Sequence, residues 1–272
     1  MGYGTLSEAT WISPYDLTKE VEDLVKRLQV KDYVQIFQAK NQGFTDPKNI
    51  VSIAWDLSRI HQKYAKDWKR RTGGKVLGYF CTYAPEEVLY AANVLPVRIL
   101  GGHEPPTLAT PHMFDMWCPF SRDYLNQGLQ GKYDYLDGIM AVNACLHPRQ
   151  AFGAWIIHVP TPWNYWFVMP NAVRSPRAKT FLRGELDEFK KAIEKWTGKI
   201  ITDKDLDRDI DIMNTNRRLM KQVYEFRKQD NPPITGTEAM TMVWASQLMD
   251  KREHNESLKQ LVEALPAYSQ AS

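Results

Sequence analysis

Residues 76–100 read VLGYFCTYAPEEVLYAANVLPVRIL, and this stretch determines the kind of fold we expect. Its two ends, 76–80 and 96–100, are short apolar runs of the kind that form buried strands. Between them Pro85 begins a helix that reaches about Val94, because proline suits the first helical turn. A strand, a helix and a second strand in this order predict a parallel βαβ unit.

The same alternation continues to residue 169. It predicts helices at 119–130 and 148–158, each opened by a proline, and strands at 138–142 and 166–169. Alternating strands and helices indicate a mainly parallel sheet with helices on both of its faces.

The regions on either side are helical in pattern. Apolar residues recur at helical spacing through 13–70, where Ser13-Pro14 and Asp46-Pro47 are typical helix starts. Residues 175–265 are also helical, and their expected N-caps are Ser175 before Pro176, Thr202 with Asp205, and Thr237.

We therefore expect an α/β protein with a parallel-sheet, flavodoxin-like domain at 75–174. An N-terminal helical region, 1–74, and a C-terminal helical region, 175–272, would flank it.

Composition excludes several classes of function. The formal net charge of +3 is too small to indicate a nucleic acid or a membrane surface as a partner. The sequence has no apolar run long enough for a transmembrane helix and no secretory signal at its N-terminus. We expect a cytoplasmic protein.

The three cysteines occupy equivalent places in this pattern. Cys81 follows the first strand, Cys118 precedes the helix that Pro119 opens, and Cys145 follows the third strand. The carboxyl ends of parallel strands meet at one edge of a sheet, where ligands bind, so the three thiols are candidates for one site. Helix N-termini favour negative charge, which suits thiolate ligands of an iron–sulfur cluster. The alternative is that each cysteine only packs in the core, as free cysteines commonly do.

Two further groups of residues are candidates for binding a substrate. His147 and Arg149 follow Cys145 closely, and the alternative is that His147 caps its helix while Arg149 pairs with a surface carboxylate. Gly101, Gly102 and His103 lie in a loop at a strand end, which could approach a ligand closely or be an ordinary turn.

An ordered set of segments resembles the family of benzoyl-CoA reductases and 2-hydroxyacyl-CoA dehydratases. The segments are 78–87 (GYFCTYAPEE), 95–101 (LPVRILG), 118–123 (CPFSRD), 133–139 (YDYLDGI), 145–152 (CLHPRQAF) and 211–227. The last two are closer to the reductase branch of that family.

The resemblance implies an enzyme subunit that holds a [4Fe–4S] cluster and transfers electrons at low potential to an aromatic acyl-CoA. It implies Cys81 and Cys118 as cluster ligands, and less directly Cys145. The implied partners are a sister subunit of similar fold and an ATP-hydrolysing activator. Dehydration of a 2-hydroxyacyl-CoA is the alternative reaction.

The sequence departs from the family pattern in two places. Some relatives carry a further cysteine where Ser121 stands, and family members run on into a second α/β domain with another cysteine. We therefore expect that this chain alone is not a competent enzyme, and that Met240, Met242, Val243 and Trp244 form an exposed apolar face. The competing hypotheses are a non-catalytic partner subunit and a structural zinc site.

Overall fold

The structure, a computed structural model, describes residues 62–101 and 105–269. The helices expected between residues 13 and 61 lie outside the described residues, as do Gly102 and His103. No helix in the described ranges is long and apolar enough to cross a membrane.

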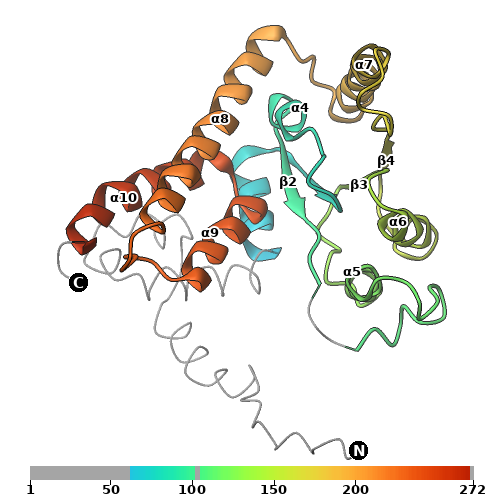
Figure 1. Cartoon of the computed structure of the whole chain (residues 1–272). Helices are drawn as coiled ribbons and strands as arrows, with labels where there is room; N and C mark the ends of the chain where they lie inside the picture. Colours follow the sequence, from blue (N-terminus) through green and yellow to red (C-terminus); the bar gives the residue numbers. More distant parts are fainter. Residues whose placement is uncertain (1–61, 102–104, 270–272) are drawn as a thin grey trace, which may run out of the picture. The chain divides into compact units, whose positions relative to one another are not determined.

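A four-stranded parallel sheet forms the centre of the fold, in the order β2-β1-β3-β4 (Figure 1). The strands are β1 (Lys75–Tyr79), β2 (Val94–Arg98), β3 (Gly138–Val142) and β4 (Asn164–Phe167). This is the order of a flavodoxin-like sheet. The expected α/β class with a parallel sheet is thus confirmed.

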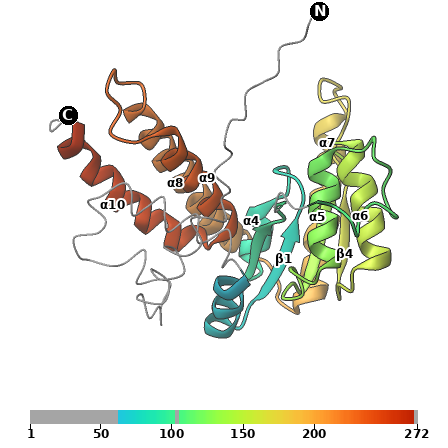
Figure 2. The same cartoon turned by 90° about the horizontal axis from the view of Figure 1, so that it is seen from below.

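Helices cover both faces of the sheet (Figures 1 and 2). The helices that follow β1, β2 and β3 are α4 (Glu86–Ala91), α5 (Pro119–Leu129) and α6 (Leu146–His158). On one face, Leu77 and Phe167 pack with α4 and with Phe189 of α7 (Ala178–Thr197). On the other face, Phe80 packs against Tyr124 of α5 and Trp155 of α6.

Close packing between α5 and α6 requires a glycine. Gly128 of α5 lies against the ring of Trp155, and a Cβ at this position would overlap that ring. Trp155 is fully buried, so it has no room to move aside.

We expect Gly128→Ala to lower the free energy of unfolding by about 1–3 kcal/mol, the usual cost of overpacking a core. Gly153→Ala in α6 is the matched control, because nothing lies within 4 Å of a Cβ built there. Removing a glycine from a helix interior gains up to about 1 kcal/mol, so the control should be neutral or stabilising. Urea unfolding of both variants measures the difference, and equal effects would contradict this packing account.

The C-terminal helices form a second group beside α4 and β2. They are α8 (Asp203–Phe226), α9 (Gly236–Leu248) and α10 (Lys251–Ser269). Thr202 caps α8 in a capping box with Asp205, as expected. The N-cap of α9 is Thr235 and not Thr237, because its hydroxyl accepts from the backbone N–H of Glu238.

The apolar face expected on α9 is mostly covered. Met242 is 4% exposed in a cluster with Val223 of α8 and Leu258 of α10, and Val243 and Trp244 are half-buried. Met240 is 50% exposed. The expectation was therefore wrong for Met242, because α8 and α10 already bury that side of α9.

Burial keeps His254 of α10 neutral in the folded protein. Its Nδ1 accepts from the side-chain amide of Asn216, and its ring also bonds the Met242 backbone. Burial first, and then the nearby charge of Lys251, lowers the pKa of His254 from 6.5 to about 3.

Stability should therefore decrease as the pH falls from about 6.5 toward 3, because the unfolded chain gains a proton that the folded chain does not. One such proton contributes at most about 1.4 kcal/mol per pH unit. His254→Asn keeps an acceptor for Asn216 and cannot titrate, so its free energy of unfolding should change less with pH. Urea unfolding of both proteins at several pH values measures the difference, and parallel curves would contradict the prediction.

Candidate functional site

All three cysteines lie at the carboxyl edge of the sheet, and their thiols are free. Cys81 follows β1 and is half-buried, and Cys118 is the N-cap of α5 with Pro119 in its first turn. Cys145 is exposed and is itself the N-cap of α6, which begins at Leu146 and not at Pro148. The cysteines therefore sit on three separate segments of one edge.

Phe80, the residue before Cys81, joins these segments. Its ring stacks on Tyr124 of α5 with centroids 4.5 Å apart, and it meets Trp155 of α6 edge-on at 5.5 Å. Because both rings are fully buried, the end of β1 is fixed between the helices that Cys118 and Cys145 cap.

A hydrogen bond links the starts of α5 and α6. The backbone N–H of Cys118 donates to Nδ1 of His147 at 2.9 Å, and the Trp117 ring meets the imidazole edge-on at 5.0 Å. His147 therefore binds the first turn of the neighbouring helix. Since Nδ1 accepts, the neutral ring carries its proton on Nε2.

Several polar side chains at this edge have buried atoms without a hydrogen bond of ordinary geometry among the described residues. They are Arg98 through Nε and Nη1, Ser121 through Oγ, Arg122 through Nε and Tyr124 through Oη. Ser121 and Tyr124 are 1% and 0% exposed. Unpartnered buried polar atoms are rare and commonly mark a missing ion, water or ligand.

Electrostatics connects these groups with the cysteines. Burial raises the pKa of Tyr124 well above its usual value, and the neighbouring thiols of Cys118 and Cys145 raise it further. The nearby Ser121 hydroxyl and the charge of Arg98 oppose this rise. Burial likewise raises the pKa of Tyr79, with Glu86 and Cys81 adding to the rise and Arg98 opposing it. Arg98 therefore influences the pKa of Tyr124, as Cys118 and Cys145 do, and the pKa of Tyr79, as Cys81 does.

The other predicted site residues have ordinary contacts. Arg149 is exposed, and its guanidinium carbon lies 5.9 Å from the ring centroid of Trp166, so its contact among the described residues is with an aromatic ring and not with a carboxylate. Gly101 packs against the carboxylate of Asp123, which a Cβ at this position would overlap.

Large apolar side chains are exposed on the same segments. Tyr83 follows Cys81, and Leu146 follows Cys145. Cys118 is preceded by Leu108, Phe114 and Met116 and followed by Phe120. Phe114 and Met116 are 76% and 84% exposed. Exposed apolar groups gathered around polar ones are typical of surfaces that bind a ligand or a partner.

The structure does not surround a single ion with these residues. Within 62–101 and 105–269, no group of three or more His, Cys, Asp or Glu side chains is arranged to hold one metal ion. A site for a single zinc ion therefore has no support from the part of the chain that is described.

Sequence reasoning missed Arg98, Ser121 and Tyr124 as candidates for the site. The one signal for Arg98 was a charged residue at the end of an otherwise apolar strand. Ser121 was noted only as the position where some relatives carry a cysteine, and nothing in the sequence distinguished Tyr124, because the surroundings of both hydroxyls depend on packing around α5.

A parallel sheet with free thiols, helix N-termini and unpartnered donors at its carboxyl edge defines an α/β protein with a candidate thiolate ligand site. Residues 81–272 match the family model described as 2-hydroxyglutaryl-CoA dehydratase, D-component, and the chain belongs to this family. The family resemblance expected from the sequence is thus confirmed. A second model, described as PaaX protein central Cas2-like domain, matches residues 1–51, which lie outside the described ranges.

Curated relatives include both reductase and dehydratase subunits. A benzoyl-CoA reductase subunit of Thauera aromatica is 28% identical over 203 residues, 74% of this chain and 53% of that protein. The (R)-phenyllactyl-CoA dehydratase beta subunit of Clostridium sporogenes is 26% identical over 212 residues, 78% of this chain and 57% of that protein. The beta subunit of (R)-2-hydroxyglutaryl-CoA dehydratase from Acidaminococcus fermentans is 25% identical over 197 residues, 72% of this chain and 52% of that protein. The chain spans little more than half the length of these relatives.

Proposed function

We propose that this chain is a subunit of an iron–sulfur enzyme that transfers electrons at low potential to an aromatic acyl-CoA, with benzoyl-CoA as the substrate whose ring is reduced. The observation that carries the proposal is the set of three free thiols on separate segments of one sheet edge, with unpartnered buried donors beside them. Family membership and the similarity to a benzoyl-CoA reductase subunit support it.

Three cysteine thiols on separate segments are a ligand set of the kind that a [4Fe–4S] cluster takes. Each cysteine of such a cluster binds a different iron, so its ligands need not surround one point. Cys81, Cys118 and Cys145 would hold three irons, and the fourth would take a ligand from elsewhere. The cluster would supply single electrons at low potential to a substrate activated by its thioester.

Other residues of this edge would bind and orient the substrate. His147 has Nε2 left to donate, because its Nδ1 already accepts from Cys118. Arg149 keeps its guanidinium donors while it stacks on Trp166. The apolar side chains on the surrounding loops, including Phe114 and Met116, would exclude water from the thioester and the ring. Gly101, Gly102 and His103 remain candidates for the loop that approaches the CoA.

The proposed partners are a sister subunit of similar fold and an ATP-hydrolysing activator that delivers the electrons. ATP dependence would place the complex in the cytoplasm. Exposed apolar residues around the cysteines are consistent with a surface that packs against a sister subunit.

A second candidate function is dehydration of a 2-hydroxyacyl-CoA, which the names of two relatives favour. Both reactions would use the same cysteines. The assembled complex, with activator, ATP and reductant, should be assayed anaerobically with benzoyl-CoA and with a 2-hydroxyacyl-CoA. We expect turnover of benzoyl-CoA. Turnover of the 2-hydroxyacyl-CoA alone would establish the dehydratase function, and turnover of neither, without bound iron, would favour a non-catalytic partner subunit.

A further inference from the structure

A positive charge lies half-buried at the carboxyl end of β2. Arg98 is the last residue of this strand and is paired in register with Tyr79 of β1, whose ring centroid lies 5.7 Å from its guanidinium carbon. Its Nε and Nη1 atoms are buried without a hydrogen-bond partner among the described residues. Guanidinium groups are normally buried only with an anion, so this position suits a negative group that none of the described residues supplies.

Two buried hydroxyl groups lie at the same edge of the sheet. Ser121 lies in the first turn of α5, three residues after Cys118, and Tyr124 lies one turn further, stacked on Phe80. The hydroxyls of Ser121 and Tyr124 are close to each other, and their hydrogen bond lowers the pKa of Tyr124, but the described residues offer these two hydroxyls no other partner. Each hydroxyl has one proton to donate, to the other hydroxyl or to a group bound beside them.

These donors are near the thiols. Arg98 is paired in register with Tyr79, two residues before Cys81, and Ser121 lies in the first turn of α5, whose N-cap is Cys118. A group bound by cysteine thiolates carries net negative charge on its sulfur atoms, and donors to those sulfurs stabilise it. Hydrogen bonds to sulfur and nearby charge are also what a protein uses to set the reduction potential of such a group.

We propose that Arg98, Ser121 and Tyr124 are positioning residues that donate hydrogen bonds to the sulfur atoms of the group held by Cys81, Cys118 and Cys145, and that the charge of Arg98 raises its reduction potential. The inference rests on the proposed function, because it requires a cysteine-bound cluster. Beyond that function, it says that residues at the end of β2 and in the first two turns of α5 set the reduction potential of this cluster.

The test uses the full chain, loaded anaerobically with iron and sulfide, and a redox titration followed by electron paramagnetic resonance. Adding an electron makes the bound group more negative, so removing the nearby positive charge should make reduction harder. We expect Arg98→Met to lower the equilibrium constant of one-electron reduction about tenfold, which corresponds to a reduction potential about 59 mV lower. Tyr124→Phe and Ser121→Ala should lower the reduction potential by a smaller amount. The reduction potential of Arg98→Lys should stay close to that of the unchanged protein.

Matched controls come from exposed positions of the same residue types. Arg218→Met removes an arginine whose side chain is 64% exposed on α8, and Tyr224→Phe removes a hydroxyl from a residue 43% exposed on that helix. Neither should change the potential, and circular dichroism should show that all variants are folded.

The outcomes separate the two proposals. Iron absent from the unchanged protein would overturn the proposed function and this inference together. Iron bound equally by all variants, with equal potentials, would overturn only the inference. If Arg98→Met loses iron while Arg98→Lys keeps it, the charge is needed and the inference holds. If both lose iron, the side chain acts through its shape and the inference is wrong.

Discussion

Cys118→Ala is expected to remove most of the iron from this chain while leaving its fold intact. The Cys118 side chain makes no capping hydrogen bond, and the contact with His147 uses only the backbone N–H, which alanine keeps. The free energy of unfolding of the metal-free protein should therefore change by less than about 1 kcal/mol, as for other substitutions that disturb no buried contact. Iron per chain should fall at least about tenfold, because a cluster with a lost thiolate ligand is labile.

Cys81→Ala should give the same result, and Cys145→Ala decides whether the exposed third thiol is also a ligand. The matched control is Met116→Ala, two residues from Cys118 and 84% exposed, which should keep its iron. Iron and acid-labile sulfide, measured after anaerobic purification, check the prediction. Iron retained in full by both Cys81→Ala and Cys118→Ala would show that these cysteines are not ligands.

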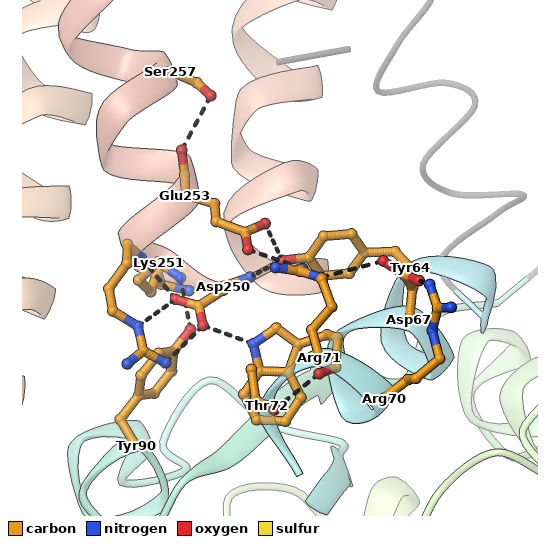
Figure 3. A network of polar contacts seen from close by, with 12 residues as sticks. Tyr64, Asp67, Arg70, Arg71, Thr72, Tyr90, Asp250, Lys251, Glu253 and Ser257 are labelled. Carbon is orange, nitrogen blue, oxygen red and sulfur yellow. Dashed lines mark hydrogen bonds and ion pairs between the residues drawn. The ribbon is translucent and has the colours of Figure 1, made fainter. Parts of the chain in front are cut away.

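Asp250→Ala is expected to destabilise the fold by about 2–3 kcal/mol, because a buried donor loses its acceptor and a partly exposed arginine loses its partner. Asp250 is 3% exposed at the start of α10 (Figure 3). Its carboxylate accepts from Nε1 of Trp68 at 2.8 Å and from the Arg252 guanidinium at 2.7 Å. Burial opposes its charge, but Arg252 and Trp68 together lower the pKa of Asp250 below its usual value.

Removing this carboxylate leaves the buried indole N–H without an acceptor. The same network joins the helix at 62–72 to α10 through a hydrogen bond from the Tyr64 hydroxyl to Glu253, and α4 to α10 through the Glu86–Lys251 ion pair. Asp211→Ala is the control, because its contact with Arg218 on the surface of α8 is 3.5 Å long and exposed. The control should stay within about 0.5 kcal/mol. Urea unfolding of both variants measures the difference, and a loss below about 1 kcal/mol for Asp250→Ala would show that the network contributes little.

The sequence predicted the existence and order of the sheet elements better than their ends. The strand at 138–142 has the expected bounds, whereas β2 lies two residues earlier than expected, at Val94–Arg98. Hydrophobicity continues to Leu100, but pairing stops where β1 ends, with Tyr79 opposite Arg98. Strand ends depend on the neighbouring strand, which local sequence does not reveal.

The candidate site was predictable only in part. Strand ends and helix starts placed the cysteines at one edge, because proline and apolar runs mark these positions locally. The contact of His147 with Cys118 spans 29 residues, and that of Trp68 with Asp250 spans 182. Such pairs form only when the helices pack, so no local pattern indicates them.

The most direct test of the account is the metal content and visible spectrum of the anaerobically purified chain. A bound [4Fe–4S] cluster predicts a brown protein with about four irons and four sulfides per chain, bleached by air. A colourless protein that contains zinc or no metal at all, and that takes up no iron and sulfide on anaerobic reconstitution, would contradict the central claim.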